Sequence, residues 1–243
     1  MNPIETSNLG KRLEGKPILT DLNISLPQGA LYGLLGRNGA GKTTLIKTLM
    51  GLFIADSGSA LVLGDDLGHG CPPAKRRTGY VAEGDILPSW ARIRDLVVFE
   101  RGLREEWHPA GVEAWLAGER LSDRRAVGAL SKGIRKRLEL ELVLAGCPQV
   151  LLMDEPLSGL DPVSRTEFLE SFMGYVADRK ATVLISSHVL TDLERVCDRI
   201  GVLAGGRIAY EETMDVIKER GGGLEDIGVE LIRKYDRRDG VNA

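Results

Sequence analysis

The chain has 243 residues, of which 43% are hydrophobic and 28% are charged, and its formal net charge is -3. These are values of a globular protein with a substantial core, and the charge argues against a protein built chiefly to bind nucleic acid, which needs a basic surface. No apolar run is as long as a membrane span and the N-terminus lacks a secretion signal pattern, so we expect a cytoplasmic protein that reaches a membrane only through a partner.

The first third of the chain is rich in strand patterns. Short strands are predicted at 18–19 and 22–26, with a turn at 27–29. The compact apolar run at 30–35 is typical of a buried strand, and apolar residues at helical spacing predict a helix at 43–51. Further strands are predicted at 57–63 and 79–82.

The segment from about 87 to 129 has a different pattern. Apolar residues recur at helical intervals and strand patterns are few, which indicates a helical insertion. It carries all three tryptophans, Trp90, Trp107 and Trp115, which we expect to pack locally in a core.

Strand patterns typical of burial on both sheet faces return at 150–153, 181–186 and 199–203. Helices lie between them, so the predicted core is α/β. The pattern of the tail predicts a hairpin turn at 205–206, a short strand, a helix from Met214, a glycine break at 221–223 and a last helix.

We predict one domain over 1–243: a core with a β region at 1–86, the insertion at about 87–129, the core continued at 130–210 and a helical tail at 211–243.

The chain has three cysteines, Cys71, Cys147 and Cys197. Their number is odd and their spacing is not that of metal ligands. They suit a reducing compartment, as small buried or half-buried residues.

A glycine-rich loop follows the apolar run at 30–35 and opens the first predicted helix. Gly36, Gly41, Lys42 and Thr43 match the pattern G-x-x-x-x-G-K-[ST], in which backbone N–H groups point at phosphate oxygens. Lys42 would reach the β- and γ-phosphates of a nucleoside triphosphate, and the Thr43 hydroxyl would bind Mg²⁺. The loop residues predicted to contact the nucleotide are Gly36, Asn38, Gly39, Ala40, Gly41, Lys42, Thr43 and Thr44.

Two adjacent acids, Asp154 and Glu155, follow the apolar strand at 150–153. Adjacent carboxylates at a buried strand end are costly without a cation, so the pair favours a metal site. Asp154 would hold the water shell of Mg²⁺, and Glu155 is predicted to be the general base that polarises the attacking water.

Ser131 opens a helix whose apolar stripe is Ile134, Leu138 and Leu142 and whose charged face is Arg135, Lys136, Glu139 and Glu141. Serine is a favoured N-cap, which by itself explains its presence. Gly133 in the first turn costs roughly 1 kcal/mol relative to alanine. A glycine there lets a ligand approach the backbone closely, so the pattern predicts a second phosphate-binding element at the helix N-terminus.

In their order along the chain, these motifs resemble a nucleotide-binding subunit of an ATP-binding cassette (ABC) transporter. The resemblance implies a P-loop NTPase core with a mostly parallel sheet, an N-terminal antiparallel β subdomain and a helical insertion. It also implies that Ser131 and Gly133 bind the γ-phosphate held by a second cassette, so that two ATP molecules lie between two subunits. Asp161 matches the D-loop at that interface, and His188 matches the switch histidine that contacts the γ-phosphate. The catalytic residues that it implies are Lys42, Glu155 and His188.

Four positions depart from the pattern of that family. Lys132 and Ile134 replace a glycine and a polar residue in the signature segment. Glu83 stands where most members carry a glutamine; it can still bind magnesium-linked water but adds a negative charge beside the γ-phosphate. Leu13 stands where an aromatic residue would stack on adenine, which leaves base selectivity open. None of these changes removes a group needed for hydrolysis.

Within the family, the chain resembles bacterial exporters whose cassette is a separate chain from a polytopic membrane permease, which implies export of a drug, a peptide, a lipid or a polysaccharide. The resemblance implies docking of the permease in the cleft between core and insertion, with residues 83–96 lining the cleft and Trp90 a candidate contact. The protein would then lie on the cytoplasmic face of the membrane, and the partner cassette would be an identical or a different chain.

Two other functions are weighed against this one. A non-transport ABC ATPase that acts on ribosomes or DNA is the alternative, although such proteins usually fuse two cassettes or carry long coiled-coil insertions. A catalytically inactive regulatory cassette is opposed by the presence of Lys42, Asp154, Glu155 and His188. The transported molecule cannot be read from this sequence, because substrate contacts belong to the permease.

Overall fold

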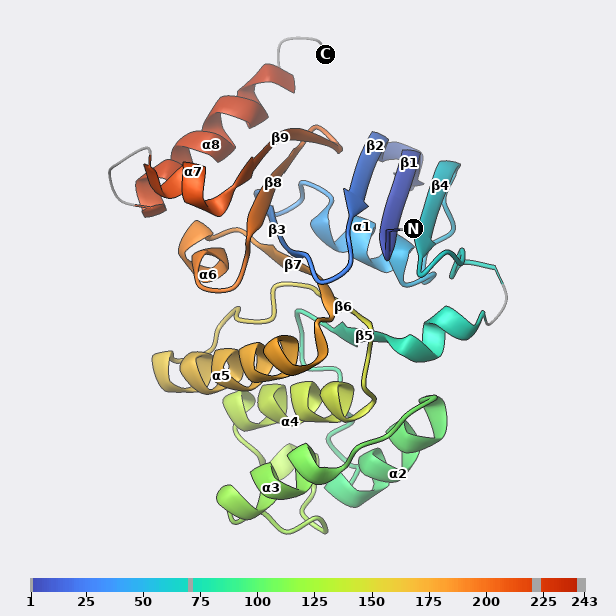
Figure 1. Ribbon diagram of the computed structural model, residues 1–243, viewed down its shortest axis with the longest axis vertical. Helices are drawn as coiled ribbons and strands as arrows, with labels where there is room; N and C mark the ends of the chain where they lie inside the picture. The colour runs from blue at the N-terminus through green and yellow to red at the C-terminus, as the bar shows by residue number, and fades with distance from the viewer. Residues whose placement is uncertain (1, 70–71, 220–223, 240–243) are drawn as a thin grey trace.

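The computed structural model describes residues 2–69, 72–219 and 224–239, and its strands form two sheets (Figure 1). The smaller sheet is antiparallel, with β1 (Ile4–Leu13) between β2 (Lys16–Leu26) and β4 (Ser57–Val62). The larger sheet has six strands and is parallel except for its last pair, β8 and β9. Its strands, in spatial order, are β5 (Thr78–Val81), β6 (Val150–Met153), β7 (Thr182–Ser187), β3 (Leu31–Leu35), β8 (Arg199–Ala204) and β9 (Arg207–Thr213).

Both faces of the larger sheet are buried along its parallel strands, as the continuous apolar strand patterns predict. In β6, Val150 and Leu152 face a core shared with the smaller sheet and with α1 (Lys42–Leu49). Leu151 and Met153 face the opposite core. The helices that complete this second core are α4 (Lys132–Ala145), α5 (Pro162–Arg179), α6 (Leu190–Glu194), α7 (Met214–Glu219) and α8 (Leu224–Asp239).

The predicted insertion is helical and lies beyond α4, away from the sheets (Figure 1). It contains α2 (Ile93–Leu103), α3 (Ala110–Gly118) and the short 3₁₀ helix η2 (Val127–Ala129), which pack with α4 around a third core. Trp107 and Trp115 pack against this core as expected. The expectation for Trp90 is wrong, because this residue is 81% exposed.

The N-terminal strands differ most from the prediction. β1 is absent from it, and β2 is one strand rather than two. β1 escapes detection because shifts in its register break the alternation, and because polar Thr6 takes a core position by hydrogen bonding to the backbone of Leu22 and Ile24. The predicted break in β2 falls at Asp21, where φ is +47° although pairing with β1 resumes on both sides.

In the tail, β9 and the start of α7 at Met214 agree with the prediction, and the glycine break at 221–223 lies outside the described residues. Cys71 also lies outside them, while Cys147 is half-buried and Cys197 is buried, as expected. None of the helices in the described ranges combines the length and the apolar character needed to span a membrane.

Candidate active site

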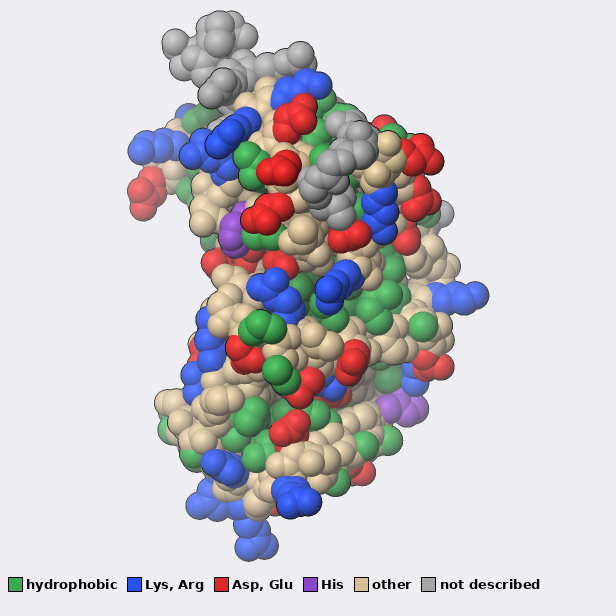
Figure 2. Space-filling model, turned by 90° about the vertical axis from the view of Figure 1, so that its left-hand side faces the viewer, with side chains coloured by type: hydrophobic (Ala, Val, Ile, Leu, Met, Phe, Trp, Pro, Cys, Tyr) green, Lys and Arg blue, Asp and Glu red, His purple; other side chains and the backbone are tan. Residues whose placement is uncertain are grey.

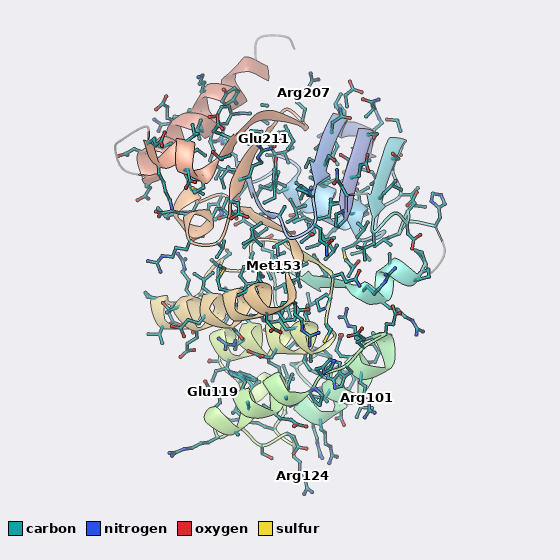
Figure 3. The ribbon with its side chains drawn as sticks, in the orientation of Figure 1. Arg101, Glu119, Arg124, Met153, Arg207 and Glu211 are labelled. Atoms are coloured by element: carbon teal, nitrogen blue, oxygen red, sulfur yellow. The ribbon has the colours of Figure 1, made fainter. Side chains whose placement is uncertain are left out.

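The predicted site residues lie just after the carboxyl ends of neighbouring parallel strands. The glycine-rich loop follows β3, the acids Asp154 and Glu155 follow β6, and His188 follows β7. Because β6, β7 and β3 are paired side by side in parallel, their carboxyl ends lie at one edge of the sheet. Figure 3 labels Met153, the last residue of β6, near the middle of the molecule.

The loop between β3 and α1 has the curled backbone that phosphate binding requires. Gly39 and Gly41 have φ values of +85° and +106°. At Gly41 an added methyl group would lie 3.2 Å from the carbonyl oxygen of Ile18, so both conformation and space favour glycine. Gly41 is also the N-cap of α1, whose first N–H groups have no partner within the helix and are available to an anion.

Lys42 is buried among oxygen atoms. Its ammonium donates to the carbonyls of Gly36 at 2.7 Å and Arg37 at 3.1 Å, and it lies 3.0 Å from a carboxylate oxygen of Glu155. The side chains of Lys42 and Glu155 are only 5% and 7% exposed. The arrangement places a desolvated positive charge at the base of the loop, where a phosphate would compete with Glu155 for it.

Ser186 connects the two acids. Its hydroxyl donates to Asp154 at 2.8 Å and accepts the N–H of Glu155 at 2.9 Å. Asp154 is 1% exposed, and Glu155 has a φ of +44°, which is unusual for a residue with a side chain and turns the chain sharply after β6. The other carboxylate oxygen of Glu155 lies 2.8 Å from Nδ1 of His188. Glu155 is thus held from both sides, by Lys42 and by His188.

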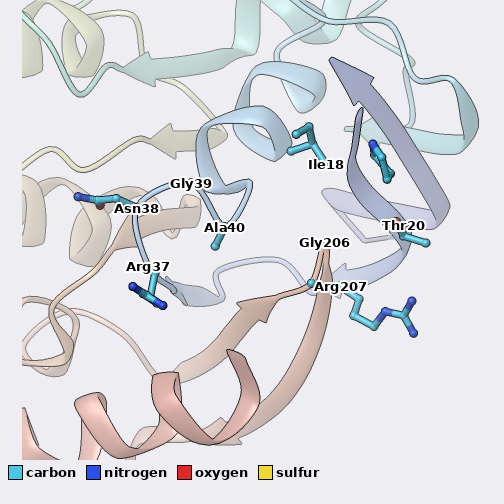
Figure 4. Close-up of a pocket in the computed structure, with 10 residues that line it drawn as sticks. Ile18, Thr20, Arg37, Asn38, Gly39, Ala40, Gly206 and Arg207 are labelled. Atoms are coloured by element: carbon cyan, nitrogen blue, oxygen red, sulfur yellow. The ribbon is translucent and has the colours of Figure 1, made fainter. Parts of the chain in front are cut away.

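Two adjoining pockets lie over the loop. The first, of about 430 Å³, is lined by Ile18, Asn38, Gly39, Gly41, Lys42, Thr43, Thr44, Glu83 and Glu155. The second, of about 600 Å³, is lined by Pro17, Ile18, Thr20, Arg37, Asn38, Gly39, Ala40, Gly205, Gly206 and Arg207, most of which Figure 4 labels. Every predicted loop residue except Gly36 lines at least one of them.

The base of the nucleotide was predicted to contact Leu13, but Leu13 lines neither pocket. It is half-buried at the end of β1. Ile18, on β2, lines both pockets and is the apolar residue best placed beside the loop. The sequence did not single it out, because an apolar residue in a strand is ordinarily explained by the core.

The predicted metal ligands supply oxygen atoms only, which is the donor set that Mg²⁺ prefers. Thr43 and the exposed Glu83 line the first pocket together with Glu155. Asp154 does not line it and is bound by Ser186 behind Glu155. Three carboxylates with one lysine beside the loop leave a net negative charge that a divalent cation would offset, so these residues fit the ion.

The second predicted phosphate element lines neither pocket. Ser131 caps α4 by accepting the N–H of Ile134 at 3.3 Å, so it has the structural role of a helix N-cap. A methyl group added to Gly133 would lie 2.1 Å from the hydroxyl oxygen of Ser164 on α5. Within the chain, therefore, the absence of a side chain at Gly133 makes room for the side chain of Ser164.

Lys132 and Asp161, which lie near Gly133, also have hydrogen-bond partners within the chain. Lys132, a departure from the family pattern, donates to the carbonyl of Ser158 at 3.3 Å and so links the start of α4 to the segment that precedes α5. Asp161 caps α5, and the hydrogen bond from the Ser164 hydroxyl holds the pKa of its carboxyl below the ordinary value.

The predicted charged face of α4 is in large part buried, which the helical pattern did not indicate. Lys136 and Glu139 are 6% and 3% exposed and lie 2.9 Å apart. Glu139 accepts the N–H of Ala82 at 2.8 Å, and Lys136 donates to the carbonyls of Ala82 and Gly84, the two neighbours of Glu83. Burial raises the pKa of Glu139, and the Lys136 ammonium opposes that shift. The pair holds the backbone that carries a predicted metal ligand.

Residues 19–158, more than half of the chain, match the family model described as ABC transporter. The chain belongs to the ABC transporter family. This ABC protein is 36% identical over 238 residues to Nod factor export ATP-binding protein I of Burkholderia orbicola (strain AU 1054), covering 96% of this chain and 76% of that one. It is 31% identical over 219 residues to the bacitracin transport ATP-binding protein BcrA of Bacillus licheniformis, covering 89% and 72%.

A solved structure described as the ATP-binding subunit of an ABC transporter has the same fold, with a TM-score of 0.82 and 27% identity over 95% of this chain and 99% of that one. The predicted family and fold class are therefore confirmed, with a mostly parallel sheet, an antiparallel N-terminal sheet and helices. The ABC protein is an ATPase of this family.

Proposed function

We propose that this ABC ATPase closes as a dimer around two Mg·ATP and that their hydrolysis powers export of a substrate through a separate membrane permease. The observation that carries the proposal is the position of Glu155 beside the phosphate loop, held between Lys42 and His188. A general base that acts on water attacking a γ-phosphate has to lie beside the phosphate-binding loop, and the position of Glu155 supports that role. The relatives named for Nod factor export and bacitracin transport support the transport role.

The chemistry follows from the residues around the loop. Lys42 would turn from Glu155 to the phosphates, which frees the carboxylate to accept a proton from water. His188, 44% exposed and bonded to Glu155, would orient that carboxylate and reach the γ-phosphate. Thr43, Asp154 and Glu83 would hold Mg²⁺, which would offset charge on the phosphates.

The dimer is proposed because the second phosphate element does not reach the nucleotide pockets of its own chain. Ser131 is exposed at the N-terminus of α4, and neither it nor Gly133 lines a pocket over the loop. A γ-phosphate bound at this helix end would therefore belong to a second copy of the chain or to a related subunit.

The permease is proposed to dock in the cleft between core and insertion. A pocket of about 390 Å³ lies there, and its apolar lining includes Ile86, Leu87, Leu103 and Leu142. Apolar side chains nearby in the sequence are exposed: Ile86, Trp90, Val98, Phe99 and Leu103. Large exposed apolar residues mark an interaction site, and a permease at this site would place the ATPase on the cytoplasmic face of the membrane.

Nucleic acid is not an expected partner. On the face that Figure 2 shows, basic and acidic side chains are interspersed over the described residues rather than gathered by sign. Figure 3 labels Arg101, Glu119 and Arg124 on the insertion, again with both signs. A binder of ribosomes or DNA needs a basic surface, and no observation favours that alternative.

The test is to isolate the tagged ATPase from its own cells in mild detergent and to identify stoichiometric partners by mass spectrometry. We expect a polytopic membrane protein, retained by the wild type and by Arg124→Ala but lost by Trp90→Asp, which leaves the hydrolytic residues untouched. Ribosomal or DNA-repair proteins in its place would refute the transport role.

A further inference from the structure

Two chain links meet at the edge of the larger sheet opposite to the nucleotide pockets. The link between α2 and α3 carries Glu106 and His108, and the link between α4 and β6 carries Cys147. The N–H of His108 donates to the carbonyl of Ala145 at 2.7 Å, which fixes one link against the other. A carboxylate oxygen, an imidazole nitrogen and the thiol sulfur of these residues all lie within 4.8 Å of one another.

We propose that Glu106, His108 and Cys147 form a binding site for Zn²⁺ or a similar borderline transition-metal ion. Oxygen, nitrogen and sulfur from these three residue types are the ligands that Zn²⁺ takes, and three protein ligands leave a fourth position for water. Nothing in the spacing of the cysteines indicated this, because the ligands come together only through the fold.

The geometry is close to what the ion requires. Zinc bonds of about 2.0–2.3 Å at tetrahedral angles separate the ligand atoms by roughly 3.3–3.7 Å. The carboxylate of Glu106 and Nε2 of His108 are already 3.9 Å apart. Their side chains are 64% and 60% exposed, so rotations of exposed side chains suffice to close the site around an ion.

The local charge is compatible with a bound dication. A thiolate and a carboxylate neutralise the two charges of the metal, so the loaded site needs no further anion. The charge of the Arg179 guanidinium acts on Cys147, and that guanidinium is itself paired with Asp178 at 3.2 Å. A thiol and an imidazole are poor ligands for Mg²⁺, so this site and the oxygen site at the phosphate loop select different metals.

Cobalt titration tests the site without any activity measurement. The probe is Co²⁺ added to the tag-free full chain, without nucleotide and in excess Mg²⁺, because sulfur bound to cobalt produces a charge-transfer absorption. We expect one equivalent of Co²⁺ with that absorption, displaced by one equivalent of Zn²⁺. In Cys147→Ser the absorption is lost, and in His108→Ala the affinity falls at least about tenfold. Cys71→Ser is the matched control and keeps both.

Two results would overturn the site. One is equal binding by the wild type and Cys147→Ser; the other is an absorption that follows Cys71 instead. Circular dichroism and nucleotide binding check that each variant is folded. If Cys147→Ser misfolds, Glu106→Gln decides, because that side chain is exposed and its loss of metal affinity cannot come from a damaged core.

Discussion

Glu155 is the proposed general base of the site. One of its oxygens lies 3.0 Å from the Lys42 ammonium and the other 2.8 Å from the His188 ring. Its φ of +44° aims the carboxylate back at the loop after β6. A side chain held in this way is preorganised for one task, which makes its substitution informative.

Substitution of Glu155, the proposed general base, should abolish most ATP hydrolysis without abolishing ATP binding. Glu155→Gln keeps the shape but loses the ability to take a proton, so we expect hydrolysis to fall by about 10²–10⁴-fold while ATP binding persists. ATP should then hold the chain as a dimer in size-exclusion chromatography. Glu170→Gln, an exposed acid on α5, is the control and should leave both measurements unchanged. Unchanged hydrolysis in Glu155→Gln would remove Glu155 from the mechanism.

The role of Gly133 can also be separated into packing and ligand approach. The Cβ of Gly133→Ala would lie 2.1 Å from the hydroxyl oxygen and 2.8 Å from the Cβ of Ser164, so we expect a lower free energy of unfolding in urea, restored in part by adding Ser164→Gly. Gly174→Ala, in open space on α5, should instead stabilise by up to about 1 kcal/mol. If Gly133→Ala is fully stable but does not hydrolyse ATP, ligand approach is the requirement at this position.

At the scale of elements, α4 connects the two halves of the proposed mechanism. Its N-terminus carries Ser131, the proposed contact to the partner's ATP. Further along the same helix, Lys136 and Glu139 bind the backbone of Ala82 and Gly84 around Glu83. A movement of this helix would therefore move Glu83 as well, and with it the edge of the proposed docking cleft at Ile86.

Removing the buried ion pair between Lys136 and Glu139 should weaken the link between α4 and Glu83. Lys136→Met leaves Glu139 buried without its cation, which costs about 3–5 kcal/mol of stability. Without the ammonium, the pKa of Glu139 rises further and the protonated acid holds the Ala82 N–H less well. We expect ATP turnover to fall while affinity for ATP is kept, measured by steady-state hydrolysis and equilibrium nucleotide binding.

Arg137→Met is the matched control for this prediction. It removes an ion pair from the same helix, between Arg137 and Glu141, without touching Ala82 or Gly84. An equal loss of turnover in the two variants would mean that general destabilisation of α4, rather than its link to Glu83, is responsible.

At the scale of the molecule, the unit of function is proposed to be two chains. Ser131→Arg places a bulky side chain at an exposed helix end, so we expect the single chain to bind ATP normally and hydrolysis to be lost. Ser131→Ala measures the loss of the N-cap alone, about 0.5–2 kcal/mol of stability. Loss of ATP binding by the single chain of Ser131→Arg would place Ser131 at the pocket of its own chain.

Mixing variants provides a stricter form of this test. Ser131→Arg keeps an intact phosphate loop, and Lys42→Ala keeps an intact α4 N-terminus. A mixed dimer thus contains one complete composite site, and hydrolysis should reappear when the two inactive proteins are combined. No recovery at any mixing ratio would argue against sites shared between chains.

Local sequence patterns are sufficient to predict a structural element when the residues of one short segment alone determine its conformation or burial. The phosphate loop needs glycine for its positive φ angles, and a doubly buried strand needs a continuous apolar run, so 36–44 and 150–153 were recognised directly. The strand β1 was missed because its pairing is irregular and Thr6 replaces an apolar core residue by hydrogen bonding.

By itself, the sequence determined the family, the α/β fold and the residues of the phosphate loop and the acidic strand end, because each depends on neighbours in the chain. The tertiary structure decided that Trp90 is exposed, that Ser164 fills the space beside Gly133, and that Lys136 and Glu139 are buried. It also brought Glu106 and His108 to Cys147. These outcomes depend on which distant segments pack together, and burial of a charged or polar side chain is favourable only when such a segment supplies its partner.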